Sequence, residues 1–241
     1  MLPDIIDAPS PNFDERLSPP DMVVLHYTGM SSGEAALARL RDPAAQVSAH
    51  YLIEEDGRLY GLVPEERRAW HAGVSFWKGA TNLNHVSIGI ELVNPGHEFG
   101  YRPFPKAQID VLAELLTDIR ERWDIPDNRI LAHSDVAPDR KTDPGELFPW
   151  NDLAAAGHGF WIEPPASPGA PLGEGEEGTG VFALQAGFTR LGYDCAPSGK
   201  YDAHTTTVVS AFQRHWRPAK VDGVADGETR ARLVGLLRLA G

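Results

Sequence analysis

Residues that could do chemistry are concentrated in the segment LAHSDVAPDRKTDPG, residues 131–145, where a histidine, a lysine and several aspartates follow a short apolar run. The apolar start of this segment predicts a strand that ends at His133, and the prolines beyond it predict a rigid loop. Pro138 and Pro144 fix their own φ and restrict the residue before them, so Asp143 is predicted to lie on a stiff backbone. A metal site requires a histidine and a carboxylate that are held this firmly.

A second apolar run, MVVL, also ends in a histidine, His26. His26, His133 and Asp143 would supply two imidazoles and one carboxylate, a three-ligand set for zinc that leaves a fourth position open for water. In the strand predicted for SIGIELV, alternation buries the isoleucines and places Glu91 on the opposite face, beside the metal. The local spacing is not a regular metal signature such as HExxH, so the prediction depends on the combination of these residues.

Strands interleaved with helices predict an α/β fold, with a mixed sheet flanked by helices because one hairpin is present. The predicted strands are 21–27, 49–54, 58–63, 87–93 and 130–132, with the hairpin turn at EDG, residues 55–57. The predicted helices are 35–41, after a capping box at residues 31–34, then 106–123 and 151–156. The stretches 70–78 and 94–105 are predicted to be loops.

The composition changes at Gly159, and the stretch PPASPGAPLGEGEEG, residues 164–178, predicts a linker that is extended in its Pro-rich half and flexible in its Gly/Glu half. Three short amphipathic helical patterns follow and predict a small three-helix domain. The predicted organisation is a catalytic domain, a linker and a helical domain, with bounds 1–158, 159–177 and 178–241.

The chain has 241 residues, 42% of them hydrophobic, enough for one substantial core and a second small one. Its formal charge of -12, from 34 acidic and 22 basic residues, argues against a nucleic-acid binder. The single cysteine, Cys195, excludes an intrachain disulfide. No signal peptide follows Met1 and no stretch could span a membrane, so we expect a cytoplasmic protein, with the periplasm as the alternative. The oligomeric state is left open, and a monomer is compatible with the sequence.

These motifs resemble the zinc N-acetylmuramoyl-L-alanine amidases of the AmpD and AmiD type. The resemblance covers roughly residues 8 to 155 and rests on PSPNFDER, on strand-end His26, and on VSAHYLI, RAWHAG, SIGIEL and AHSDVAPDRKTDPG. It implies the amidase fold shared with peptidoglycan recognition proteins. Roughly residues 178 to 240 resemble the small three-helix peptidoglycan-binding domain of wall hydrolases, with its LQ, GY, GKYD and AFQ features in the expected order.

The resemblance also implies a mechanism. One zinc ion per catalytic domain, held by His26, His133 and Asp143, would bind a water and lower its pKa to about 7. Glu91 would take the proton and return it to the leaving amine, while Lys141 and the zinc would stabilise the oxyanion. The bond implied by the family joins the lactyl group of N-acetylmuramic acid to L-alanine of the stem peptide.

Four further residues are candidates for substrate contacts: Tyr27, Trp70, His71 and Asn94. Loop packing is an equal interpretation for Trp70 and His71. His50 is interpreted as structural, and it is the substitute if one proposed ligand is wrong.

The expected partners are peptidoglycan fragments or peptidoglycan itself. We expect a recycling enzyme that cleaves soluble muropeptides, the 1,6-anhydro form among the candidates. The attached domain is typical of enzymes that act on intact wall, so a periplasmic wall amidase is the alternative. A hypothesis of another class is a zinc-free protein that binds muropeptides and signals. It is disfavoured because the three ligands, Glu91 and Lys141 are all present.

Overall fold

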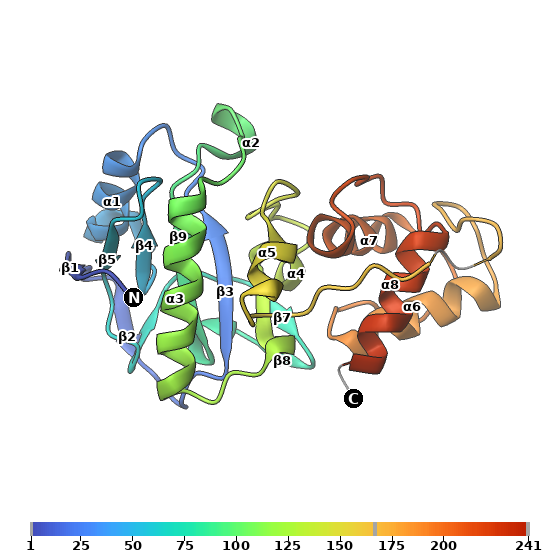
Figure 1. The fold of residues 1–241 in the computed structure, drawn as a ribbon. Helices are drawn as coiled ribbons and strands as arrows, with labels where there is room; N and C mark the ends of the chain where they lie inside the picture. Colours follow the sequence, from blue (N-terminus) through green and yellow to red (C-terminus); the bar gives the residue numbers. More distant parts are fainter. Residues whose placement is uncertain (1, 166–167, 240–241) are drawn as a thin grey trace.

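A six-stranded mixed sheet forms the centre of the first part of the chain (Figure 1). In the computed structural model, which describes residues 2–165 and 168–239, the strand order is β1-β5-β4-β9-β3-β10. In that order the strands are Ile5–Asp7, Leu59–Gly61, Tyr51–Ile53, Ser87–Leu92, Met22–Tyr27 and Ile130–Ala132. All neighbours are parallel except β4 and β5, which form the predicted antiparallel hairpin. Two small sheets pair β2 (Phe13–Glu15) with β6 (Arg67–Ala69) and β7 (Phe76–Trp77) with β8 (Ala80–Thr81).

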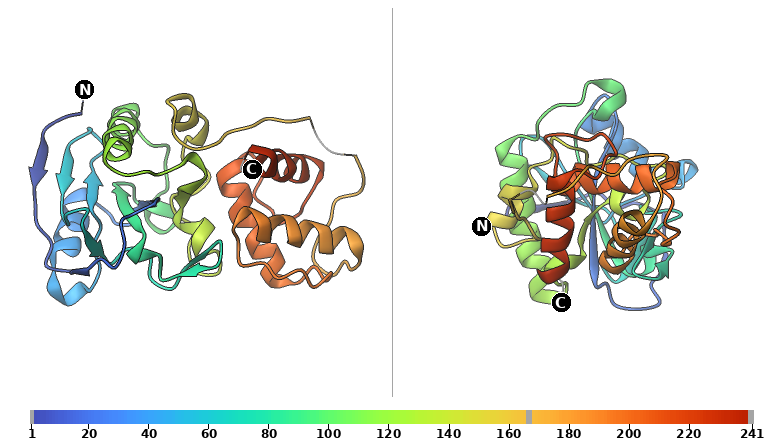
Figure 2. Two further views of the ribbon diagram at one scale, coloured as in Figure 1. Left: turned by 90° about the horizontal axis from the view of Figure 1, so that it is seen from below. Right: turned by 90° about the vertical axis from the view of Figure 1, so that its right-hand side faces the viewer.

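Helix α3 (Lys106–Arg122) covers one face of this sheet, and helix α1 (Gly33–Arg41) lies on the other (Figures 1 and 2). Alternate residues of the central strands pack beneath α3, among them Val23, Leu25, Ile88, Ile90 and Leu92. Because side chains alternate along a strand, His26 and Glu91 point to the opposite face. The candidate site residues His26 and Glu91 therefore lie on the face of the sheet opposite α3.

The remaining helices are α2 (Gly96–Phe99), α4 (His133–Val136), α5 (Trp150–Ala155), α6 (Thr179–Leu191), α7 (Ala203–Trp216) and α8 (Gly227–Leu239). The predicted mixed sheet, its flanking helices and the three C-terminal helices are confirmed. Three predicted loops differ from the structure: the short strand β7 lies within 70–78, α2 lies within 94–105, and α4 begins at His133 itself. Helix α1 also starts differently, because Ser32 rather than Ser31 is its N-cap and accepts from the Ala35 N–H at 3.1 Å.

Residues 168–178, which lead into α6, lie against the other helices of the helical domain (Figures 1 and 2). Leu172 and Ala225 exchange two backbone hydrogen bonds, of 3.1 and 2.8 Å. In the Gly/Glu half, which was predicted to be flexible, the Gly175 N–H donates to the Tyr201 carbonyl at 2.9 Å. The composition of this segment predicts a flexible backbone, but its backbone groups form hydrogen bonds with the helical domain.

One apolar cluster joins the two domains. It contains Met22, Trp77 and Leu131 from the sheet side and Phe188 and Leu191 from α6. The helical domain therefore shares a core with the catalytic domain. Among residues 2–165 and 168–239, no helix is long and apolar enough to cross a membrane.

Candidate metal centre and active-site cleft

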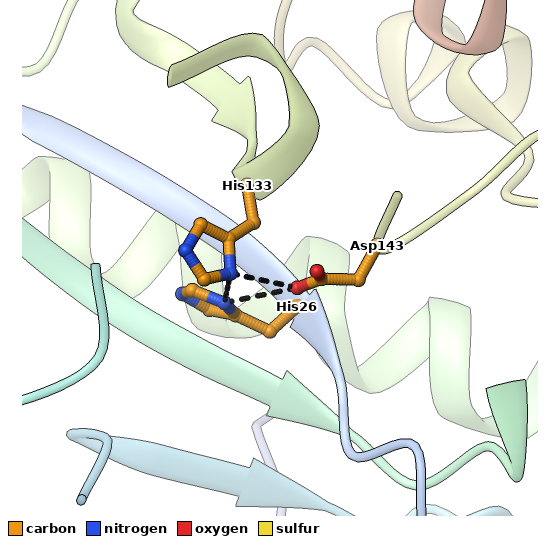
Figure 3. A group of neighbouring side chains, drawn as sticks. All are labelled: His26, His133 and Asp143. Atoms are coloured by element: carbon orange, nitrogen blue, oxygen red, sulfur yellow. Dashed lines mark hydrogen bonds and ion pairs between the residues drawn. The ribbon is translucent and has the colours of Figure 1, made fainter. Parts of the chain in front are cut away.

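The three predicted ligands lie together at the ends of β3 and β10 (Figure 3). Nδ1 of His26 is 2.8 Å from Nδ1 of His133, and Oδ2 of Asp143 is 3.2 Å from the first and 3.0 Å from the second. All three residues are buried, with at most 6% of their surface exposed. The structure thus contains a His-His-Asp site that could hold a metal ion.

Strand register explains how the site forms. In the β3–β10 pair Leu25 lies opposite Ala132, so the next residue of each strand is one of the two histidines. On the other side of β3, His26 lies directly opposite Glu91 of β9. Neighbouring parallel strands therefore place His133, His26 and Glu91 side by side at one edge of the sheet.

The donor set fits a metal ion. A tetrahedral zinc ion with bonds of about 2.0–2.2 Å separates its ligand atoms by roughly 3.3 Å, close to the observed spacing. Burial and the neighbouring His133 lower the pKa of His26 to about 4, so this imidazole is neutral near pH 7. Burial by itself would raise the pKa of Asp143, but His133 and His26 hold that pKa below its usual range. A neutral imidazole and an ionised carboxylate are the forms that bind metals.

His71 lies directly beside His26, on the side of its ring that faces away from the other two ligands. Its Nδ1 is 3.0 Å from Nε2 of His26, and its Nε2 is 3.2 Å from Oγ of Ser87, which donates to the Leu83 carbonyl at 2.7 Å. Because Nδ1 of His26 faces the other ligands, this contact at Nε2 sets the orientation of the ring. The ring of His71 fits only because Gly89 has no side chain: a Cβ there would lie 2.4 Å from it.

A cavity of about 450 Å³ opens above the ligands. The predicted residues Tyr27, Trp70, His71, Glu91 and Lys141 all line it together with the triad. Residues that the sequence reasoning did not single out also line it: Met30, Arg39, His97, Glu98 and Arg140. Two of these, His97 and Glu98, lie on α2, the helix that was predicted to be a loop.

Two other predicted residues lie outside this cavity. The side chain of Asn94 is buried, donates to the Arg102 carbonyl at 2.8 Å and accepts from the Gly96 N–H at 3.0 Å. These contacts support a role in shaping the loop before α2, not in touching substrate. His50 is buried and accepts from the Gly89 N–H at Nδ1, 2.9 Å, away from the ligand group.

Glu91 and Glu98 both line the cleft, and Glu91 is the one that lies on the strand beside His26. Its Oε2 is shielded from solvent and has no hydrogen-bond partner among the described residues. Burial, and then the charge of Asp143, raise the pKa of Glu91 well above its usual value, while Lys141 opposes the shift. A shielded carboxyl group with a raised pKa and one unpaired oxygen is suited to carrying a proton near neutral pH.

A buried His-His-Asp set with an adjacent acid, on a mixed sheet, is the arrangement that a metal-dependent hydrolase would need. Residues 16–146 match the N-acetylmuramoyl-L-alanine amidase family, and residues 177–233 match a peptidoglycan binding domain. The chain belongs to the N-acetylmuramoyl-L-alanine amidase family. The prediction of an amidase with an attached peptidoglycan-binding-like domain is confirmed.

Several relatives resemble the chain over most of its length. N-acetylmuramoyl-L-alanine amidase AmiD of Escherichia coli is 39% identical over 91% of this chain and 83% of its own. Its structure with the substrate anhydro-N-acetylmuramic acid-L-Ala-D-gamma-Glu-L-Lys matches with a TM-score of 0.80 and 38% identity, covering 93% of this chain and 91% of that one. AMPDH3 of Pseudomonas aeruginosa, in complex with anhydromuramic pentapeptide, has a TM-score of 0.77 and 32% identity, covering 92% and 93%. The 1,6-anhydro-N-acetylmuramyl-L-alanine amidase AmpD of Haemophilus influenzae is 35% identical over 62% of this chain and 90% of its own.

Proposed function

We propose that this protein hydrolyses the amide between N-acetylmuramic acid and L-alanine of the peptidoglycan stem peptide, with zinc held by His26, His133 and Asp143. The observation that carries this proposal is the buried triad, whose ligand atoms lie 2.8–3.2 Å apart beneath a cavity that Glu91 and Lys141 also line. The amidase family is zinc-dependent in general. When bound, zinc supplies Lewis-acid activation of water and of the scissile carbonyl.

The protein's own groups then have distinct tasks. Glu91 accepts a proton from the attacking water at its unpaired oxygen and delivers it to the leaving nitrogen of L-alanine. Lys141, which has no ion-pair partner among the described residues, presents its ammonium group to the negative charge that develops on the carbonyl oxygen. His71 is a positioning residue, because it acts through its 3.0 Å contact with His26.

We propose soluble anhydromuropeptides as the substrates, in cell-wall recycling. The support is that the structures of two relatives of nearly the same length contain anhydromuropeptides. The cavity also lies wholly in the catalytic domain, since every residue that lines it precedes α5. The match of residues 177–233 to a peptidoglycan binding domain favours intact peptidoglycan as the second candidate. The compartment stays a prediction: soluble anhydromuropeptides as substrates would place the protein in the cytoplasm, and intact peptidoglycan would place it in the periplasm.

The test is mass spectrometry of the products formed from purified anhydromuropeptides and from intact sacculi, each with and without a chelator. Chelator-sensitive release of free stem peptide from the soluble substrate alone supports the recycling proposal. Comparable release from sacculi identifies a wall hydrolase. No release from either substrate refutes the proposed hydrolysis and favours a protein that only binds muropeptides.

A further inference from the structure

A second buried polar cluster lies outside the cleft, where the two domains meet. It consists of Asp135 from α4, Tyr193 from the turn after α6 and His215 from α7. The Tyr193 hydroxyl donates to Oδ1 of Asp135 at 2.6 Å, and Nδ1 of His215 lies 2.6 Å from Oδ2. All three residues are at most 2% exposed. The carboxylate belongs to the catalytic domain, and both side-chain partners belong to the helical domain.

This carboxylate depends on the helical domain. A buried carboxylate is costly unless hydrogen bonds and charges compensate for the lost water. Within its own domain, Asp135 has one such bond, from the Ala132 N–H at 2.8 Å. No other side chain of the described residues bonds to it. The ring of His215 also stacks on Trp150 of the catalytic domain, with ring centroids 3.5 Å apart.

The same short helix carries a proposed metal ligand. Helix α4 has four residues and begins with His133, two positions before Asp135. A helix of one turn has no stability of its own, so its tertiary contacts must set its orientation. On the metal side, the Ser134 N–H donates to the Asp143 carbonyl at 2.9 Å. On the other side, Asp135 bonds to Tyr193 and His215, and Val136 packs into the apolar cluster that joins the two domains.

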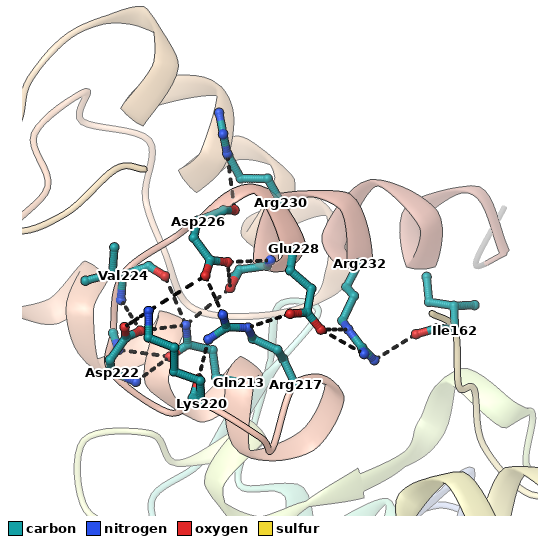
Figure 4. Close-up of polar contacts among 12 residues, drawn as sticks. Ile162, Gln213, Arg217, Lys220, Asp222, Val224, Asp226, Glu228, Arg230 and Arg232 are labelled. Atoms are coloured by element: carbon teal, nitrogen blue, oxygen red, sulfur yellow. Dashed lines mark hydrogen bonds and ion pairs between the residues drawn. The ribbon is translucent and has the colours of Figure 1, made fainter. Parts of the chain in front are cut away.

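The helical domain is docked firmly enough to act as this support. The Lys78 N–H donates to the Gly192 carbonyl at 2.8 Å, and the ring of Trp77 fills the space where a Gly192 side chain would lie. Ile162 is held as well: the Arg232 guanidinium donates to its carbonyl at 2.8 Å, beside a network of ion pairs around α8 (Figure 4). The domain is thus fixed by contacts on two sides.

We propose that the helical domain is a structural part of the metal centre: by holding Asp135, Tyr193 and His215 orient α4 and thereby His133. All three are positioning residues, and this inference rests on the proposed function. It gives the domain a role that does not depend on binding the wall.

The test compares matched deletions of one buried hydroxyl in the full-length protein. Tyr193→Phe removes the bond to Asp135. Tyr201→Phe removes an equally buried hydroxyl whose 2.6 Å bond, to the Gly223 carbonyl, stays within the helical domain. His215→Phe keeps an aromatic ring beside Trp150 but removes the other bond. The readouts are the apparent zinc dissociation constant from chelator competition, the visible absorption of the cobalt-substituted protein, and circular dichroism.

We expect Tyr193→Phe and His215→Phe to weaken zinc binding about tenfold and to shift the cobalt absorption. Loss of a group bonded directly to a ligand typically costs about 10–100-fold in metal affinity, and these two residues act one step further out, through α4. Tyr201→Phe should change neither readout, and all three variants should retain the helical content of the wild type. Unchanged zinc affinity and cobalt absorption in both Tyr193→Phe and His215→Phe would overturn this inference but not the proposed metal centre. A wild-type protein without stoichiometric zinc would overturn the proposed metal centre and this inference with it.

Discussion

Replacing Gly89 by alanine should damage the metal centre although Gly89 is not one of its ligands. A Cβ at this position would lie 2.4 Å from Cγ and 2.6 Å from Nδ1 of His71. Carbon atoms normally approach no closer than about 3.5 Å, so the ring or the strand must move by roughly 1 Å. Gly89 lies within β9, where pairing with Val24 of β3 and a 2.9 Å hydrogen bond from the His50 N–H to its carbonyl resist movement. We therefore expect the ring of His71 to move and its 3.0 Å contact with His26 to break.

Two magnitudes follow from this displacement. Overpacking a buried site costs about 1–3 kcal/mol of unfolding free energy. Loss of an outer partner of a ligand typically costs about 10–100-fold in metal affinity or activity. For Gly89→Ala we expect a zinc dissociation constant raised at least tenfold and kcat/KM lowered by about 100-fold. Chelator competition and the release of stem peptide from anhydromuropeptides measure the two quantities.

Gly180→Ala is the matched control, because the nearest atoms to a Cβ there lie at 3.7 and 3.8 Å, an ordinary contact. It should leave zinc affinity and turnover within twofold of the wild type. The double variant with His71→Ala identifies the cause: once the ring is absent, Gly89→Ala should add little further loss. Zinc affinity and kcat/KM within twofold of the wild type in Gly89→Ala itself would refute the idea that His71 orients His26.

Three other variants test separate parts of the structure. Glu91→Gln should retain stoichiometric zinc by metal analysis but lower kcat by about 10²–10⁴-fold, and full turnover would remove Glu91 from its role. Lys141→Met should lower kcat by about 100-fold, corresponding to ~3 kcal/mol of barrier, whereas a change confined to KM would contradict oxyanion stabilisation. Burial by itself would raise the pKa of Glu65, but hydrogen bonds from Arg122 and other donors lower it below the usual value. The ionised Glu65 therefore stabilises the fold above the unfolded pKa of about 4.5, and this stabilisation is lost as the pH falls through the folded pKa. Because the side chain of Arg122 is 41% exposed and would not be left as a buried charge, Glu65→Gln should be less stable by about 1–2 kcal/mol at pH 7. Denaturant unfolding measures the difference in unfolding free energy between the two proteins, and a difference that stays constant in acid would contradict this.

Stretches with regular apolar spacing, bounded by proline and glycine, predicted most of the elements that carry the site. The apolar spacing of 106–123 predicted α3, and apolar runs predicted the strands that end near His26 and His133. Proline, glycine and glutamate marked the segment between the domains. These features depend on contacts within a few residues, which a sequence displays directly.

Only the tertiary structure decided how these parts meet. Register places Glu91 opposite His26, and Asp143 reaches His26 across 117 positions. Helix α4 replaced a predicted loop, and Asp135 within it has partners 58 and 80 positions away in another domain. Periodicity and turn chemistry report only on near neighbours, whereas a buried carboxylate is satisfied by whichever donors the folded chain brings to it.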